Sequence, residues 1–212
     1  MKIIGITGNI GSGKSRVASH ICTLNELTDQ MCKVKAQQVD ADDLARKIIN
    51  INQGKLSDFG DEIVKDGAVD WCQLFNEVFN PPNEKLQRIR SFNRWIHELV
   101  ANKIMSMIEI AKKNGNKYFF FSAPLLFEAR IPTDFLILVT CDDCIRRQRV
   151  AFRSLQRGIP VERTEILASI QFPQSIMRYY CDYEIDNTGN FEKDTIPQII
   201  NVINEIVGDN NE

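Results

Sequence analysis

The sequence lacks an excess of either charge, any internal repeat and any low-complexity stretch. Its 26 Lys and Arg residues nearly balance 28 Asp and Glu residues, so the net charge is −2 and nothing global attracts nucleic acid or an anionic membrane. Apolar residues make up 43% of the 212 residues, which excludes a disordered chain. The composition is that of an ordinary globular protein. Because its net charge is close to zero, it would have to bind an anionic ligand through a local group of side chains or backbone N–H groups.

Long hydrophobic runs are also absent. The longest apolar stretch, residues 118–127, is interrupted by Ser122 and Pro124 and falls short of the roughly 18 residues of a membrane span. The first residues lead into a patterned segment without the apolar region of a secretion signal. We therefore expect no membrane association and a cytoplasmic location.

Side chains that bind transition metals are sparse and scattered. The chain has six cysteines and two histidines, which favours reduced thiols over a disulfide framework. Cys141 and Cys144 form a C-x2-C pair, but a structural zinc site needs four ligands and few further candidates exist. We expect no structural zinc.

The first fifteen residues carry the strongest pattern. A β-branched run at residues 2–7 precedes Gly8–Ser15, which reads G-x4-G-K-S, and apolar residues at helical spacing follow. This is a P-loop pattern, in which backbone N–H groups and a helix N-terminus bind phosphates. Lys14 is expected to reach the β- and γ-phosphates and Ser15 to offer its hydroxyl to Mg²⁺. The string arises by chance in about one chain in a hundred of this length, but here it lies at a strand-to-helix junction.

The remainder of the chain alternates helical and strand patterns. Continuous apolar runs at residues 117–122 and 135–140 are typical of parallel strands covered on both faces. A period near 3.6 predicts helices at residues 42–51, at residues 89–111 and after Thr195. We predict an α/β protein with a three-layer, doubly wound parallel sheet, in which ligands bind at the carboxyl ends of the strands.

GTPases, transport ATPases and small-molecule kinases all contain P-loops. The chain has no N-K-x-D string for guanine, and its strand at residues 118–122 ends in Ser-Ala-Pro instead of Asp-Glu. Asp40 and Asp42, which follow a weak strand and precede a helix, favour a kinase. One carboxylate can accept the proton of an acceptor hydroxyl, and the other can help hold hydrated Mg²⁺. Helix capping also explains the pair and is compatible with both roles.

A cluster of basic residues forms the second polar feature. Five arginines occur within twelve residues: Arg146, Arg147, Arg149, Arg153 and Arg157. We predict a helix that ends near Gly158 and Pro160 and serves as a mobile lid, whose guanidinium groups offset charge on the transferring phosphoryl group. A solvated basic face is the alternative.

In their order and spacing, the motifs resemble the dephospho-coenzyme A kinase family, over Met1 to about Val207. The resemblance is carried by Gly8–Ser15, Asp40-Ala41-Asp42, Phe59-Gly60, Asp66-Gly67, Leu74 with Phe79, Pro124–Glu128, the arginine helix, Gln171 and Ile185-Asp186-Asn187. It implies a P-loop fold like that of nucleoside monophosphate kinases. The implied reaction transfers the γ-phosphate of ATP to the ribose 3′-hydroxyl of dephospho-CoA, giving CoA and ADP in the last step of coenzyme A biosynthesis.

The resemblance also implies roles for individual residues. Asp42 would be the general base, Lys14 the phosphate clamp and Arg153 the catalytic lid residue. ATP would be bound by Gly11, Ser12, Gly13, Lys14, Ser15, Arg16, Arg149 and Asn187. The acceptor would be bound by Asp40, Pro124, Leu125, Leu126, Glu128 and His97. Mg²⁺ would be held by Ser15 and, through water, by Asp40.

The implied organisation is a single kinase domain over residues 1–212. Its core would comprise about residues 1–50, 115–145 and 182–208, its helical acceptor-binding region about residues 51–114, and its lid about residues 146–172. The implied partners are ATP and dephospho-CoA with Mg²⁺. We infer no nucleic acid, membrane or obligate protein partner.

The chain departs from the family pattern at several positions. It has Arg16 for Thr or Ser, Asn9 for Gly, Glu98 for the Pro after His97, Ser122 for a frequent acid, and Trp71 for a usual Arg. The lid is about three residues longer than usual, so either Arg149 with Arg153 or Arg153 with Arg157 fits the family register. Two alternatives therefore stay open: another P-loop kinase acting on a nucleoside or nucleotide, and a nucleotide-binding regulatory module.

Overall fold

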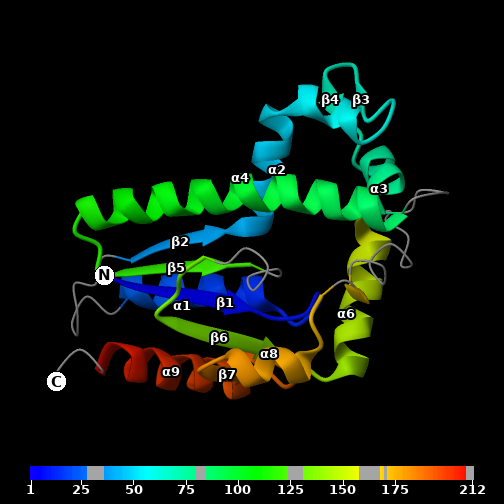
Figure 1. The fold of residues 1–212 in the computed structure, drawn as a ribbon. Coiled ribbons are helices and arrows are strands. Elements are labelled where there is room, and N and C mark those ends of the chain that lie inside the picture. The colour runs from blue at the N-terminus through cyan, green and yellow to red at the C-terminus, as the bar shows by residue number, and fades with distance from the viewer. Residues whose placement is uncertain (28–35, 80–84, 124–130, 158–167, 170, 209–212) are drawn as a thin grey trace. The chain divides into compact units, whose positions relative to one another are not determined.

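The computed structural model describes residues 1–27, 36–79, 85–123, 131–157, 168–169 and 171–208 (Figure 1). The chain forms two compact units, one from Met1–Asp40 and Met107–Glu212 and the other from Ala41–Ser106. Within the described ranges, no helix combines the length and the apolar character needed to cross a membrane.

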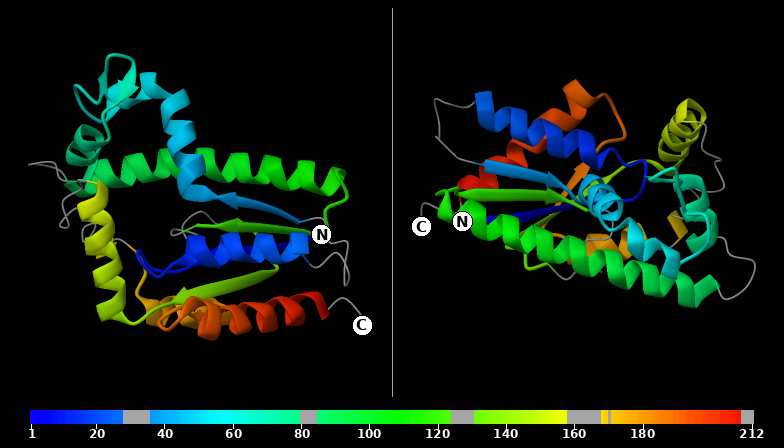
Figure 2. Two further views of the ribbon diagram at one scale, coloured as in Figure 1. Left: turned by 180° about the vertical axis from the view of Figure 1, so that it is seen from behind. Right: turned by 90° about the horizontal axis from the view of Figure 1, so that it is seen from above.

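A parallel sheet of five strands in the order β2-β5-β1-β6-β7 forms the centre of the first unit (Figures 1 and 2). The strands are β1 (Lys2–Thr7), β2 (Ala36–Asp40), β5 (Tyr118–Ser122), β6 (Phe135–Thr140) and β7 (Tyr183–Asp186). The central strand, β1, pairs with β5 and β6. Ser122 lies opposite both Ile6 of β1 and Asp40 of β2, so three strands end at the same edge of the sheet.

Helices cover both faces of this sheet. On one face, α1 (Lys14–Leu27), the π-helical turn η2 (Phe191–Thr195) and α9 (Ile196–Gly208) contribute to a core. Its members include Ile4, Ile6, Val17, Ile21, Phe120, Ile137, Val139, Ile185, Ile199 and Ile206. On the other face, Leu138 is fully buried and α8 (Gln174–Tyr180) contacts β6. The predicted fold is confirmed, as are the helices that were expected at residues 42–51, at residues 89–111 and after Thr195.

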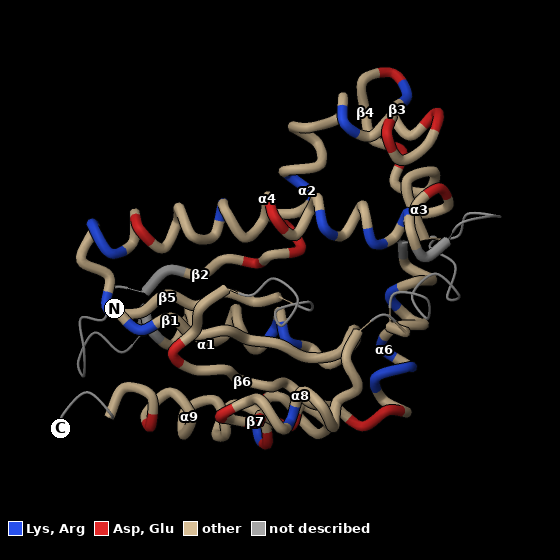
Figure 3. Tube along the Cα trace, in the orientation of Figure 1, with Lys and Arg blue, Asp and Glu red and all other residues tan. Residues whose placement is uncertain are grey.

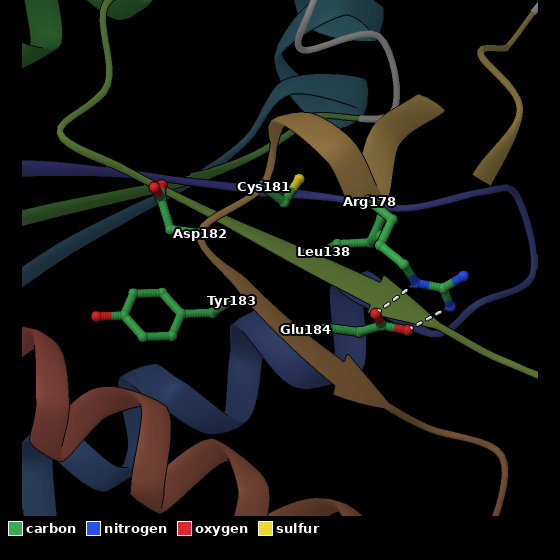
Figure 4. A pocket seen from close by; sticks show the side chains of 6 residues that line it. All are labelled: Leu138, Arg178, Cys181, Asp182, Tyr183 and Glu184. Atoms are coloured by element: carbon green, nitrogen blue, oxygen red, sulfur yellow. Dashed lines mark hydrogen bonds and ion pairs between the residues drawn. The ribbon is translucent and has the colours of Figure 1, made fainter. Parts of the chain in front are cut away.

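A bidentate ion pair joins α8 to the sheet (Figure 4). Arg178 Nε and Nη2 donate to Glu184 Oε2 and Oε1 at 2.6 and 2.7 Å, and Thr140 Oγ1 donates to Glu184 Oε1 at 3.0 Å. The hydrogen bond from Arg178 lowers the pKa of the Glu184 carboxyl group. At the C-terminal end of α8, burial raises the pKa of the Cys181 thiol to about 12.

The same residues line a hollow of about 230 Å³, formed by Leu138, Arg178, Cys181, Asp182, Tyr183 and Glu184. Its charged groups are bonded within the protein, because Asp182 Oδ2 accepts a hydrogen bond from the backbone of Leu136 at 2.8 Å and Arg178 pairs with Glu184. These bonds attach α8 to the sheet, and the charged side chains that line the hollow are already engaged within the protein.

Helices dominate the second unit. Its elements are α2 (Ala41–Ile51), the 3-10 helix η1 (Gln53–Asp58), β3 (Val64–Lys65), β4 (Ala68–Val69), α3 (Trp71–Phe79) and the first part of α4 (Lys85–Lys113). Asp66 and Gly67 join β3 to β4 with φ values of 51° and 76°, the left-handed conformation that a tight two-residue hairpin requires. Asp70 caps α3 by accepting hydrogen bonds from the backbone of Cys72 and Gln73 at 2.9 Å.

Aromatic side chains form the core of the second unit. Phe92 packs edge-to-face with Phe59 at 5.2 Å between ring centroids, and Phe79 lies 5.3 Å from Phe75. Trp95 also contacts Phe59 and Phe92. Such aromatic pairs add stabilisation beyond the area that they bury, and they give this small unit a core of its own.

Candidate functional site

The P-loop connects β1 to α1 at the carboxyl end of the central strand. A Cβ atom on Gly8 would lie 2.4 Å from the carbonyl oxygen of Val139, so the strand end accepts only glycine there. The Ser12 N–H donates to Asn9 O at 3.0 Å, and Val17 N–H donates to Gly13 O at 3.1 Å to begin α1. The strand, turn and helix predicted from the sequence are thus all present.

Two residues of the loop interior are buried and polar. Lys14 is 8% exposed, and lysine is rarely so buried unless its ammonium group is engaged. Ser12 is 1% exposed, and its hydroxyl has no hydrogen-bond partner among the described residues. A buried group of this kind suits a loop built to bind a polar ligand.

Distant side chains hold the first part of the loop. Gln171 Oε1 accepts a hydrogen bond from Ile10 N–H at 2.9 Å, and Arg146 Nη1 donates to Ile10 O at 3.3 Å. Asn9 Nδ2 donates to Phe172 O at 3.4 Å. Residues far along the chain therefore set the path of the loop.

Asp40 lies at the end of β2 and accepts hydrogen bonds from two hydroxyl groups. Its Oδ2 atom is 3.3 Å from Ser15 Oγ and 3.1 Å from Ser122 Oγ. Carboxylate and hydroxyl oxygens are the hard ligands that Mg²⁺ prefers, so this pair of groups fits the ion. The described part of the chain has no cluster of three or more His, Cys, Asp or Glu residues, and Mg²⁺ usually binds through few side chains plus phosphates and water.

The side chain of Arg16 extends to η2. Its guanidinium group lies 3.8 Å from the centroid of the Phe191 ring and 3.5 Å from a carboxylate oxygen of Glu192. Arginine stacks well on aromatic faces because its charge is delocalised over a planar group. The Arg16 side chain, which was predicted to bind ATP, thus contacts Phe191 and Glu192 at the start of η2 in this structure.

Helix α6 (Asp143–Arg157) carries the predicted arginines, which Figure 3 shows as blue stretches. Arg149 contacts the P-loop and Cys141, whereas Arg147 pairs with Asp143. Arg153 is exposed and makes no hydrogen bond or ion pair with any described residue. Nothing is described of the Arg157 side chain, so the register of the lid stays a prediction.

A buried thiol, that of Cys141, lies beside this helix. Burial raises its pKa, although the Arg149 guanidinium 3.3 Å away acts in the opposite direction. A raised pKa keeps the thiol protonated and unreactive at neutral pH, which agrees with the expectation of reduced cysteines.

The remaining predicted residues lie elsewhere. Asp42 is exposed in the first turn of α2, and His97 is half-buried in α4, where burial lowers its pKa; both belong to the second unit. Pro124, Leu125, Leu126 and Glu128 lie outside the described residues. The first unit brings together the P-loop, Asp40, Arg149 and Asn187, and also Ser122, which the sequence marked only as a departure from the family pattern.

The geometry defines a class of protein. The first unit has the architecture of a P-loop kinase. Its parallel sheet carries a P-loop after the central strand, a carboxylate is bonded to the P-loop serine, and an arginine-bearing helix contacts the loop. The sequence matches the family described as dephospho-CoA kinase over residues 2–193, and the chain belongs to that family. The family predicted from the motifs is thereby confirmed, and with it the kinase activity of the last step in coenzyme A biosynthesis.

Individual relatives agree with this assignment. The dephospho-CoA kinase of Syntrophotalea carbinolica is 29% identical over 214 residues, which cover 98% of this chain and 93% of the relative. A solved protein of Thermus thermophilus is 27% identical with a TM-score of 0.72, and the match covers 98% of this chain and 97% of that one. The dephospho-CoA kinase of Campylobacter jejuni, at 20% identity and a TM-score of 0.57 over 97% of both chains, shares the fold.

Replacement of Gly8 tests the fit of the P-loop against the sheet. Gly8→Ala places a Cβ atom 2.4 Å from a backbone oxygen, so we expect the melting temperature without nucleotide to fall by about 5 °C or more and nucleotide binding to weaken. Gly54→Ala is the matched control, because a Cβ there meets nothing within 4 Å, and its melting temperature should change by less than about 2 °C. Equal melting temperatures for the two variants, measured by thermal unfolding, would contradict this account of Gly8.

Proposed function

We propose that this chain transfers the γ-phosphate of ATP to the ribose 3′-hydroxyl of dephospho-CoA and releases CoA and ADP. The observation that supports the proposal most is the contact between Asp40 and the hydroxyl of Ser15, the P-loop serine, in a chain of the dephospho-CoA kinase family. The contact supports the proposal because the serine of a P-loop lies next to the phosphates of the bound nucleotide.

On the ATP side, the backbone N–H groups of Gly11–Ser15 bind the phosphates, and Lys14 provides a positive charge to the β- and γ-phosphates. Ser15 and Asp40 would hold Mg²⁺, with water between Asp40 and the ion. The ion, when bound, supplies positive charge that offsets the charge of the phosphate oxygens. Arg149 and Asn187 complete the ATP site from α6 and from the end of β7.

On the acceptor side, Asp42 accepts the proton of the 3′-hydroxyl as its oxygen attacks the γ-phosphorus. A new oxygen–phosphorus bond forms, the bond between the γ-phosphorus and the bridging oxygen breaks, and ADP leaves. Asp42 is suited to this role because its carboxylate is exposed, at the N-terminus of α2. We assign contacts with the acceptor to His97 and to Pro124, Leu125, Leu126 and Glu128.

Arg153 acts from α6 on the transferring phosphoryl group. Its guanidinium group is exposed and makes no hydrogen bond or ion pair with a described residue, whereas Arg146 and Arg149 already contact the P-loop. A permanently charged planar group can offset the charge that spreads over the phosphoryl oxygens in the transition state.

An ADP-release assay with ATP and Mg²⁺ tests the proposed reaction. Dephospho-CoA should stimulate ADP release, and mass spectrometry should identify CoA as the product. Stimulation by a nucleoside instead would indicate another P-loop kinase. Stimulation by no acceptor would indicate a nucleotide-binding regulatory module.

Replacement of Asp42 tests the general base. Asp42→Asn removes the proton acceptor, so we expect kcat to fall about 10²-fold or more while the affinity for ATP stays close to that of the wild type. Asp43→Asn is the matched control, because Asp43 is also exposed in the first turn of α2 and its loss changes the helix charge equally. Unchanged turnover of Asp42→Asn, or an equal loss in both variants, would remove Asp42 from the mechanism.

Replacement of Arg153 tests its action on the phosphoryl group. Arg153→Ala should slow phosphoryl transfer at least about tenfold in single-turnover measurements and leave the melting temperature unchanged, because its side chain is exposed. Arg147→Ala serves as the control, since Arg147 is exposed on the same helix and pairs with Asp143. A rate for Arg153→Ala within about twofold of the wild type would support a merely solvated basic face.

A further inference from the structure

The carbonyl oxygen of Ser12, inside the P-loop, accepts hydrogen bonds from two side chains. Asn187 Nδ2 donates to it at 2.7 Å, and Arg149 Nη1 donates at 3.4 Å. The two donors are joined to each other, because Arg149 Nη2 donates to the carbonyl oxygen of Asn187 at 2.9 Å. The middle of the P-loop is therefore bonded to α6 and to the loop after β7.

The Asn187 amide is buried against the loop. Asn187 is 3% exposed, and its backbone N–H donates to Thr140 O at 2.9 Å, which attaches the residue to the end of β6. A Cβ atom on Gly13 would lie 2.1 Å from Asn187 Nδ2, so the amide occupies the space where any other residue at position 13 would place its side chain. The contact depends on glycine at that position.

Thr195 determines which way the Asn187 amide faces. Thr195 is fully buried at the end of η2, and its hydroxyl donates to Asn187 Oδ1 at 3.2 Å, with the carbonyl oxygen of Asp186 at 3.5 Å as a second acceptor within reach. If the amide were reversed, Oδ1 would face the oxygen of Ser12 and the two would repel. The hydroxyl therefore keeps the nitrogen of Asn187 toward the P-loop.

We propose that Thr195 is a positioning residue for ATP binding, and that Thr195, Asn187 and Arg149 form a clamp on Ser12. The clamp holds the Ser12–Gly13 peptide so that the N–H groups of the loop converge on the phosphates. The inference rests on the proposed function to the extent that the P-loop binds the phosphates of ATP. It gives Asn187 an indirect part in ATP binding in place of the direct contact with ATP that the family resemblance implies, because both ends of its amide are already bonded within the protein.

Inorganic tripolyphosphate is the probe that separates these roles, since it offers phosphates without a base. Thr195→Val keeps the shape of the side chain and removes the hydroxyl. In calorimetric titrations, we expect it to bind tripolyphosphate about fivefold more weakly than the wild type, as for the loss of one buried hydrogen bond. Thr195→Ser, which retains the hydroxyl, should stay within about twofold of the wild type.

A second variant and a control complete this experiment. Thr195→Ala removes the hydroxyl without adding volume and should show the same loss if Thr195→Val does not fold. Thr140→Val is the control, because Thr140 is also buried and loses one hydrogen bond, to Glu184, without a side-chain contact to the P-loop. Its affinity for tripolyphosphate should match that of the wild type.

Base selectivity provides the second measurement. If the clamp positions only the P-loop, Thr195→Val should weaken ATP and GTP equally and leave their affinity ratio unchanged. If Thr195→Val instead reduces the preference for ATP over GTP and leaves the affinity for tripolyphosphate unchanged, the clamp would be overturned. Asn187 would then be assigned a direct contact with the adenine base. Failure of the wild type to bind tripolyphosphate would overturn both the clamp and the proposed P-loop role, whereas normal binding by folded Thr195→Val would overturn the clamp alone.

Discussion

The parallel pairing of β1 with both β5 and β6 is the constraint on which the first unit depends. Most apolar side chains of these strands are buried, and Ile4, Phe119 and Ile137 are fully buried. A slip of one residue would move every side chain to the opposite face of the sheet and against a different set of packing partners, so packing on both faces determines the register. The further pairing of β2 with β5 sets Asp40 opposite Ser122, at the sheet edge where the P-loop begins. Hydrophobic burial thus positions the polar groups of the site.

Patterns of short range in the sequence predicted most of the fold and part of the site. The strands, the long helix and the P-loop each follow from local periodicity or from one contiguous string. The hydrogen bond between Ser15 and Asp40 joins two residues that the family resemblance assigned to Mg²⁺, an assignment that stays a prediction. Contacts between distant positions were not accessible in this way. Ser122 bonds to a residue 82 positions away and Asn187 to one 175 positions away, and no local pattern specifies such pairs. Thr195 carried no signal at all, because a threonine before a helix is common and its partner is known only from the fold.

Departures from the family pattern acquire contacts of their own in this chain. Arg16 stacks on Phe191 and pairs with Glu192. Ser122, where an acid is frequent, donates a hydrogen bond to Asp40, which leaves this edge of the sheet with one negative charge fewer than an acid would give. In the second unit, the guanidinium group of Arg46 lies 5.7 Å from the ring of Trp71, so a positive charge is retained close to a position that usually carries arginine. At these three positions, the replacing side chain makes a local contact of its own.

The close approach of Asn187 to Gly13 has a consequence for the kinetics of nucleotide capture. A loop already fixed by interior hydrogen bonds loses little conformational freedom when phosphates arrive, because its ordering occurred during folding. Association then need not wait for the loop to rearrange, and its rate is governed by diffusion and orientation of the nucleotide. Differences in nucleotide affinity among variants of this loop should consequently come mainly from differences in the dissociation rate of the nucleotide.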